Sequence, residues 1–115
     1  MKNYKDLQVW KKAFDLSTVI YSSTKKFPKD ELFGLVSQMR RCAVSVVSNI
    51  AEGHGRGTNK DFSHFLTMSI GSCNELETQV LLAEQLGYIK KEASESLQAN
   101  CNEIIKMLYG LIKKL

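Results

Sequence analysis

The stretch Ser48-Asn49-Ile50-Ala51-Glu52-Gly53-His54-Gly55-Arg56-Gly57 decides the fold, because it separates two long runs of residues with helical periodicity. It holds three of the chain's seven glycines. We expect Gly53 to end the preceding helix in the left-handed conformation that glycine adopts without a steric penalty. Thr58 or Asn59 can then cap the following helix. The two helices therefore run back alongside each other.

Apolar residues recur every three to four positions on both sides of this corner, as in amphipathic helices. The pattern predicts helices over residues 6–24, 29–52 and 60–86, and a fourth that follows the connection 88–91 and runs to about residue 115. We expect Asp6 to cap the first helix, Pro28 to precede the second and Gly87 to end the third. The β-branched run 42–47 resembles a buried strand, but its phase joins the helical period on both sides.

Four amphipathic helices joined by short connections predict an all-α fold, an antiparallel up-down-up-down four-helix bundle. A length of 115 residues suits one domain, residues 1–115, with a core of its own. The three cysteines are far apart in sequence and lie at apolar positions, so we interpret them as core thiols in a reducing compartment. They are Cys42, Cys73 and Cys101.

A second stripe on the helix over 29–52 is polar, and its members are spaced alternately four and three residues apart. It is either a solvated face or a close helix–helix or subunit contact. In the second case, Arg40 and Arg41 can meet carboxylates such as Glu75 or Glu77 on another helix. The stripe comprises Gly34, Gln38, Arg41, Ser45, Ser48 and Glu52.

The charge is mildly basic, with 16 Lys and Arg against 12 Asp and Glu, a net charge of +4 and a pI of about 9.0. Such a balance permits contact with nucleic acid without requiring it. The N-terminal residues lack the apolar run of a signal peptide, and no stretch is long enough to span a membrane. We therefore expect a cytoplasmic protein without membrane contact.

No arrangement of residues in the sequence points to catalysis. His54 and His64 have no cysteine or carboxylate at metal-ligand spacing, so we predict no metal site and no cofactor. The glycine-rich corner lacks the Gly-Lys-Ser/Thr ending of a phosphate loop. It is either a plain turn or a simple anion site formed by loop amides, Arg56 and Lys60. A small-molecule substrate is not expected.

Five segments of the chain form a distinctive set of motifs: Leu7-Gln8-Val9-Trp10, Phe27-Pro28, Gln38-Met39-Arg40-Arg41, Ser45-Val46-Val47-Ser48-Asn49-Ile50-Ala51-Glu52-Gly53 and Glu75-Leu76-Glu77-Thr78. Together they resemble the bacterial four-helix-bundle proteins called 23S rRNA intervening-sequence proteins. The resemblance covers nearly the whole chain. Val47 departs from a proline common in that family, and Lys90 replaces a small cap residue, but neither change affects the expected fold.

The resemblance implies a homopentameric ring without enzymatic activity, similar to the accessory protein that partners reverse transcriptase in diversity-generating retroelements. Five subunits at +4 each would carry a formal charge of +20. RNA or DNA is then the expected partner, and Arg40, Arg41, Arg56 and Lys60 are expected to bind phosphates. The alternative is a protein-interaction scaffold or accessory subunit, for example of a reverse transcriptase, that does not bind nucleic acid directly. The expected subunit interface comprises Gln38, Arg41, Ser45, Ser48, Asn49, Glu52 and Glu75.

Overall fold

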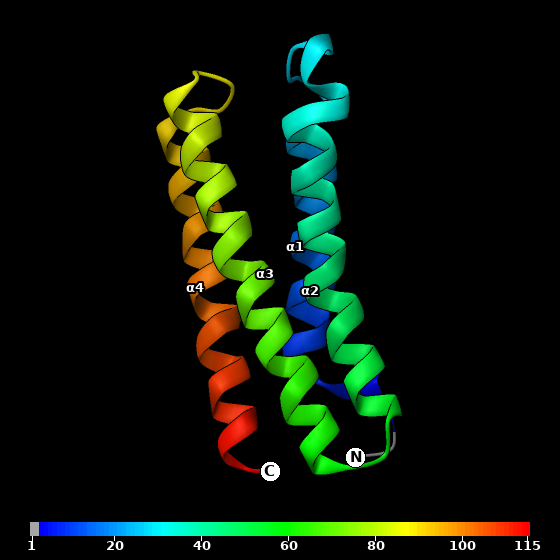
Figure 1. The fold of residues 1–115 in the computed structure, drawn as a ribbon. Coiled ribbons are helices and arrows are strands. Elements are labelled where there is room, and N and C mark those ends of the chain that lie inside the picture. The colour runs from blue at the N-terminus through cyan, green and yellow to red at the C-terminus, as the bar shows by residue number, and fades with distance from the viewer. Residues whose placement is uncertain (1–2) are drawn as a thin grey trace.

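Four long helices form the molecule in a computed structural model that describes residues 3–115 (Figure 1). They are α1 (Gln8–Thr24), α2 (Ser37–Gly55), α3 (Asn59–Gln85) and α4 (Lys91–Lys113). The connections lie at alternate ends of the bundle, and no strand occurs in the part of the chain described. The predicted all-α four-helix bundle is confirmed.

The first helix begins later than the sequence predicts, and Asp6 is not its cap. Asp6 belongs instead to a 3₁₀ turn, Tyr4–Asp6, which Asn3 caps by accepting a hydrogen bond from the amide of Lys5 at 2.9 Å. Leu7 follows in extended conformation and precedes α1 without a side-chain cap. Its side chain is buried, so hydrophobic contact rather than capping fixes this helix start.

The second helix is not continuous from residue 29, as the periodicity predicts. A 3₁₀ turn (Lys29–Glu31) and a π-helical turn (Leu32–Val36) precede α2. Glu31 stabilises the π turn because its Oε1 accepts the amide hydrogen of Leu35 at 3.2 Å. Gly34, inside the turn, has non-helical dihedral angles of φ −110° and ψ −111°. The chain therefore kinks before α2 starts at Ser37.

The corner between α2 and α3 lies further along the chain than the sequence predicts. Gly53 is not left-handed: it is a buried residue inside α2, and the positive φ of 88° belongs to Gly57. A Cβ at Gly53 would lie only 2.5 Å from the Cβ of Phe65 on α3. Glycine is needed there for close helix packing. The predicted cap is confirmed, since Thr58 Oγ1 accepts the amide hydrogen of Asp61 at 3.1 Å.

Gly87 ends α3 as predicted, with a φ of 80°. Its amide donates to the carbonyl of Glu84 at 3.0 Å, and the amide of Tyr88 donates to that of Ala83 at 2.9 Å. These two bonds form a Schellman motif. By contrast, α4 begins after Lys90 without a side-chain cap.

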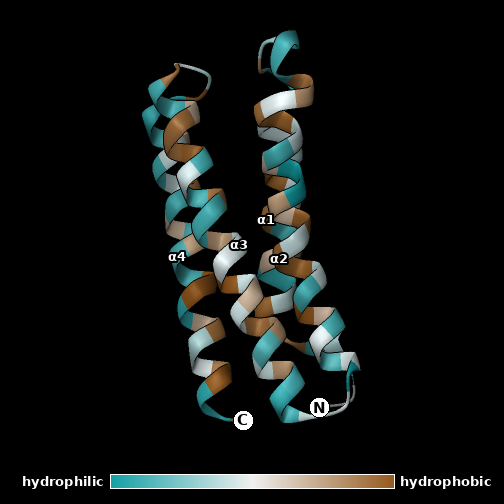
Figure 2. Cartoon of the chain, viewed as in Figure 1, coloured by the Kyte–Doolittle hydropathy of each residue, from teal (hydrophilic) through white to brown (hydrophobic). Residues whose placement is uncertain are grey.

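The core lies where the apolar stripes of the four helices meet, and Figure 2 shows hydrophobic and hydrophilic segments alternating along each helix. The run 42–47 is helical, and Cys42, Cys73 and Cys101 are buried free thiols. Burial raises the pKa of Cys73 and Cys101 to about 12 and that of Cys42 to about 11. Within residues 3–115, no helix combines the length and apolarity needed to cross a bilayer.

Replacing Gly53 with alanine should lower the free energy of unfolding by about 1–3 kcal/mol, because the new methyl group overpacks the contact with Phe65. Thermal unfolding followed by circular dichroism measures the change. Gly55→Ala is the matched control, since a Cβ there has open space around it. Equal melting temperatures for the two variants would contradict the packing role of Gly53.

The buried thiols predict a loss of stability at alkaline pH. Their ordinary pKa is 9.0, and burial raises it in the folded state, so the folded chain retains protons that the unfolded chain has lost. Their stabilising contribution is therefore complete below about pH 9 and declines as the pH rises toward 11–12. Urea unfolding between pH 8 and 11 measures it. Cys73→Ala should show a shallower decline, and an identical decline would refute the assignment.

Candidate interface on the α2–α3 face

Small polar residues connect α2 and α3 along their line of closest approach. The hydroxyl groups of Ser45 and Ser72 are 2.9 Å apart, and the hydroxyl of Ser69 donates to the carbonyl of Val46, also at 2.9 Å. Asn49 donates to the carbonyl and hydroxyl oxygens of Ser45 within α2, at 2.8 and 3.0 Å. Ser45 and Asn49, predicted for a subunit interface, thus already form hydrogen bonds inside the chain.

A groove of about 580 Å³ follows the outer side of this contact. It brings together four of the predicted interface residues, three from α2 and one from α3. Ser48 and Glu52 lie further along the exposed side of α2 and do not line the groove. The lining includes Gln38, Arg41, Ser45 and Glu75, together with Phe33 and Ser72.

The two charged residues of the groove, Arg41 and Glu75, are both exposed. In residues 3–115 the ion pairs are Lys12 with Glu103 and Arg56 with Glu52, so Arg41 and Glu75 do not pair with each other or with another charged side chain. The predicted contact between Arg41 and a carboxylate on α3 is therefore not made within the chain. Both charges remain open to a partner.

Arg40 points to the opposite side of α2 and bonds to α1. Its Nε donates to the hydroxyl of Thr24 at 2.9 Å, and its Nη2 donates to the carbonyl of Tyr21 at 3.3 Å. The guanidinium also lies 4.7 Å from the centre of the Tyr21 ring. These contacts make Arg40 the least available of the four predicted phosphate-binding residues.

At the corner, the structure does not gather the predicted cations around the loop amides. Arg56 forms an exposed ion pair with Glu52 at 3.0 Å and lies 4.9 Å from the centre of the Phe65 ring. Lys60 is exposed in the first turn of α3. A pocket of about 370 Å³ occurs nearby, but neither Arg56 nor Lys60 lines it.

His54 packs between aromatic rings at this end, 6.5 Å from the Tyr4 ring and 5.7 Å from the Phe62 ring. In the part of the chain that the structure describes, no three His, Cys, Asp or Glu side chains come together as metal ligands. The geometry around His54 indicates packing of the corner against the N-terminal turn.

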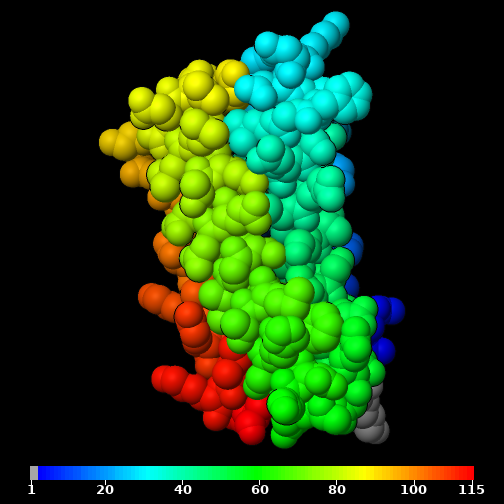
Figure 3. Space-filling view, viewed as in Figure 1, coloured from blue at the N-terminus to red at the C-terminus, as the bar shows by residue number. Residues whose placement is uncertain are grey.

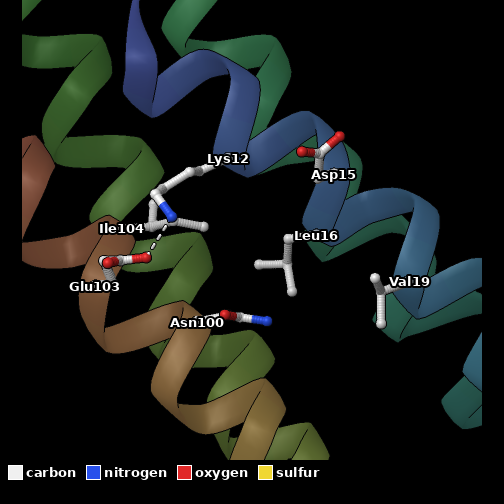
Figure 4. Close-up of a pocket in the computed structure, with 7 residues that line it drawn as sticks. All are labelled: Lys12, Asp15, Leu16, Val19, Asn100, Glu103 and Ile104. Carbon is white, nitrogen blue, oxygen red and sulfur yellow. Dashed lines mark ion pairs between the residues drawn. The ribbon is translucent and has the colours of Figure 1, made fainter.

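A smaller pocket of about 200 Å³ lies between α1 and α4 (Figure 4). Lys12 of α1 reaches across it to Glu103 of α4, with 2.7 Å between Nζ and Oε1. Leu16, Val19 and Ile104 provide its apolar surface. The ion pair is half-exposed, so it contributes at most about 1 kcal/mol and chiefly connects the first helix to the last.

Phe33 is a feature of the groove that the sequence reasoning missed. Its side chain is 92% exposed, although burying a phenylalanine side chain is worth about 1.5–3 kcal/mol. The signal was present, because this aromatic residue lies out of phase with the apolar stripe through Leu35 and Val36. The π turn places it at one end of the groove.

The chain is similar to known proteins in both sequence and structure. The sequence profile described as 23S rRNA-intervening sequence protein matches residues 5–110. A crystal structure of a protein of unknown function from the S23 ribosomal protein family, from Bacteroides thetaiotaomicron, is similar with a TM-score of 0.84 and 27% sequence identity. The similarity covers 91% of this chain and 95% of that chain. No curated protein matches.

Proposed function

The chain belongs to the 23S rRNA-intervening sequence protein family, and on this basis we propose that it is a non-catalytic, homo-oligomeric protein that binds RNA through its assembled surface. Neither the family nor the similar structure carries the name of a catalytic activity. The proposed assembly is a homopentamer in the cytoplasm. Five subunits at +4 each carry a formal charge of +20, which is substantial for recognition of a phosphate backbone.

The observation that carries this proposal is that few of the positively charged side chains are paired with a carboxylate. Of the lysines and arginines in residues 3–115, only Lys12 and Arg56 lie within ion-pairing distance of a carboxylate. The remaining cations can therefore approach phosphates without first breaking an ion pair. Arg41 and Lys60 are exposed members of this set, whereas Arg56 must leave Glu52 to bind an anion.

A second candidate function is a protein-interaction scaffold, for example an accessory subunit of a reverse transcriptase, without direct contact to RNA or DNA. The α2–α3 groove favours it, because an unpaired cation, an unpaired carboxylate and an exposed aromatic residue share one surface. Protein interfaces combine such groups around buried aromatic and arginine anchors.

Binding to a structured RNA should weaken steeply as salt rises, because each phosphate contact releases bound counterions. Filter binding from about 50 to 300 mM salt measures the slope of log affinity against log salt. Lys60→Ala should reduce that slope by about one unit, as expected for a lysine that binds one phosphate. Binding that is absent or insensitive to salt would leave the scaffold as the better proposal.

The wild-type protein should have a mass near five times the 13.0 kDa of one chain in multi-angle light scattering without RNA. Ser48→Tyr should reduce this mass, since it places a bulky ring at an exposed position of the predicted subunit interface, outside the groove. Ser22→Tyr is the matched control, the same change at an exposed serine of α1. If Ser48→Tyr keeps the full mass, this part of α2 is not a contact between subunits.

A further inference from the structure

Two connections far apart in sequence meet at one end of the bundle. The hydroxyl of Tyr88 donates to Glu31 Oε2 at 2.9 Å, and the rings of Phe27 and Tyr88 are 5.3 Å apart. Figures 1 and 3 show the two connections side by side at this end. As a result, this end carries five exposed lysines, Lys25, Lys26, Lys29, Lys90 and Lys91.

The same contacts set the position of Phe33. Glu31 uses its second oxygen, Oε1, to accept the amide hydrogen of Leu35, so one carboxylate holds both the π turn and the α3–α4 connection. The turn leaves the Phe33 ring in solvent, and Phe33 shares the groove with Arg41. The nearest of the five lysines in sequence is Lys29, four residues before Phe33.

We propose that this surface binds a single-stranded segment of RNA, with an unpaired base stacked on Phe33, a phosphate on Arg41 and the adjoining backbone along the five lysines. The inference rests on the RNA binding proposed above and names the strand type and the residues. Proteins that bind single strands combine aromatic rings, on which bases stack, with cations that follow the backbone. Here Phe33 and Arg41 share the groove, and Lys29 is only four residues before Phe33 in the chain.

The volume and polarity of the groove fit an unpaired nucleotide. Its volume of about 580 Å³ lies in the range of small-ligand sites, and Gln38 and Ser72 supply hydrogen-bonding groups for a base edge or sugar. Glu75 is the carboxylate in the lining, so a phosphate should lie toward Arg41 and away from Glu75. A duplex keeps its bases stacked inside and offers Phe33 no base face.

Fluorescence anisotropy with labelled oligouridine and with a duplex RNA of equal length tests the stacking role. Phe33→Ala should weaken oligouridine binding about tenfold, with little change in duplex binding or in the salt slope. Phe33→Trp, which keeps an aromatic face, should retain the affinity. Phe14→Ala is the matched control, because Phe14 is a half-exposed aromatic residue that stacks on Trp10 at 5.1 Å.

Replacing the lysines should change the salt dependence of binding, whereas replacing Phe33 should change mainly the affinity. Replacing Lys90 and Lys91 together with alanine should lower the salt slope for oligouridine, since it removes phosphate contacts. The same change at Lys113 and Lys114, near the opposite end of the molecule, should leave the slope closer to that of the wild type. Equal reductions of the salt slope by the two double substitutions would overturn the assignment of the phosphate contacts to one end of the bundle.

The outcomes separate this inference from the proposed function. If the wild-type protein binds no RNA at low salt, the proposed function fails and this site fails with it. If it binds RNA and Phe33→Ala binds equally well, only this inference fails. A reduced mass of Phe33→Ala in light scattering would assign Phe33 to a subunit contact instead. Phe33-dependent binding to anionic lipid vesicles but not to oligouridine would also overturn it.

Discussion

The close approach of α2 and α3 is the constraint on which the rest of the structure depends. Gly53 lets the backbone of α2 lie against Phe65, and further along the pair Ser69 bonds to the carbonyl of Val46 and Ser45 to Ser72. These contacts fix the two helices in one register, as an antiparallel pair joined by a short corner. The groove with Arg41 and Glu75 follows the outer edge of that pair. Its geometry is therefore set by residues that face inward.

The sequence predicts the helices well because each buries one face, and that periodicity is visible in the chain itself. Thr58 and Gly87 were also predictable, since a cap and a left-handed glycine act through their immediate neighbours. The family was predicted from its motifs, and the match over residues 5–110 confirms it. The role predicted for Gly53 was wrong. A glycine before a turn can be needed for a left-handed backbone or for close contact with another helix, and the sequence is the same in both cases. Only the position of Phe65 distinguishes the two.

The candidate interface was predictable in part. The spacing placed Gln38, Arg41 and Ser45 on one face, and the antiparallel pairing brought Glu75 to the same groove. It did not show that Arg40, one residue away and about 100° around the helix, would turn to Thr24 on α1. Phe33 was missed although it lies out of phase with the apolar stripe, because that spacing indicates only exposure and does not show that the π turn places the residue at the end of the groove. Whether these residues bind RNA or a second subunit depends on a partner, which neither periodicity nor packing specifies.

The three buried thiols have a consequence for the reversibility of folding. They lie on three different helices and are buried, and their raised pKa keeps them protonated in the folded bundle. Once the bundle opens, their pKa returns toward the ordinary value and the thiolates can react. Because three is an odd number, one pair in a chain leaves a thiol free to cross-link two chains. An unfolding event that lasts long enough for this oxidation is then irreversible, and the lifetime of the protein in air depends on its rate of opening.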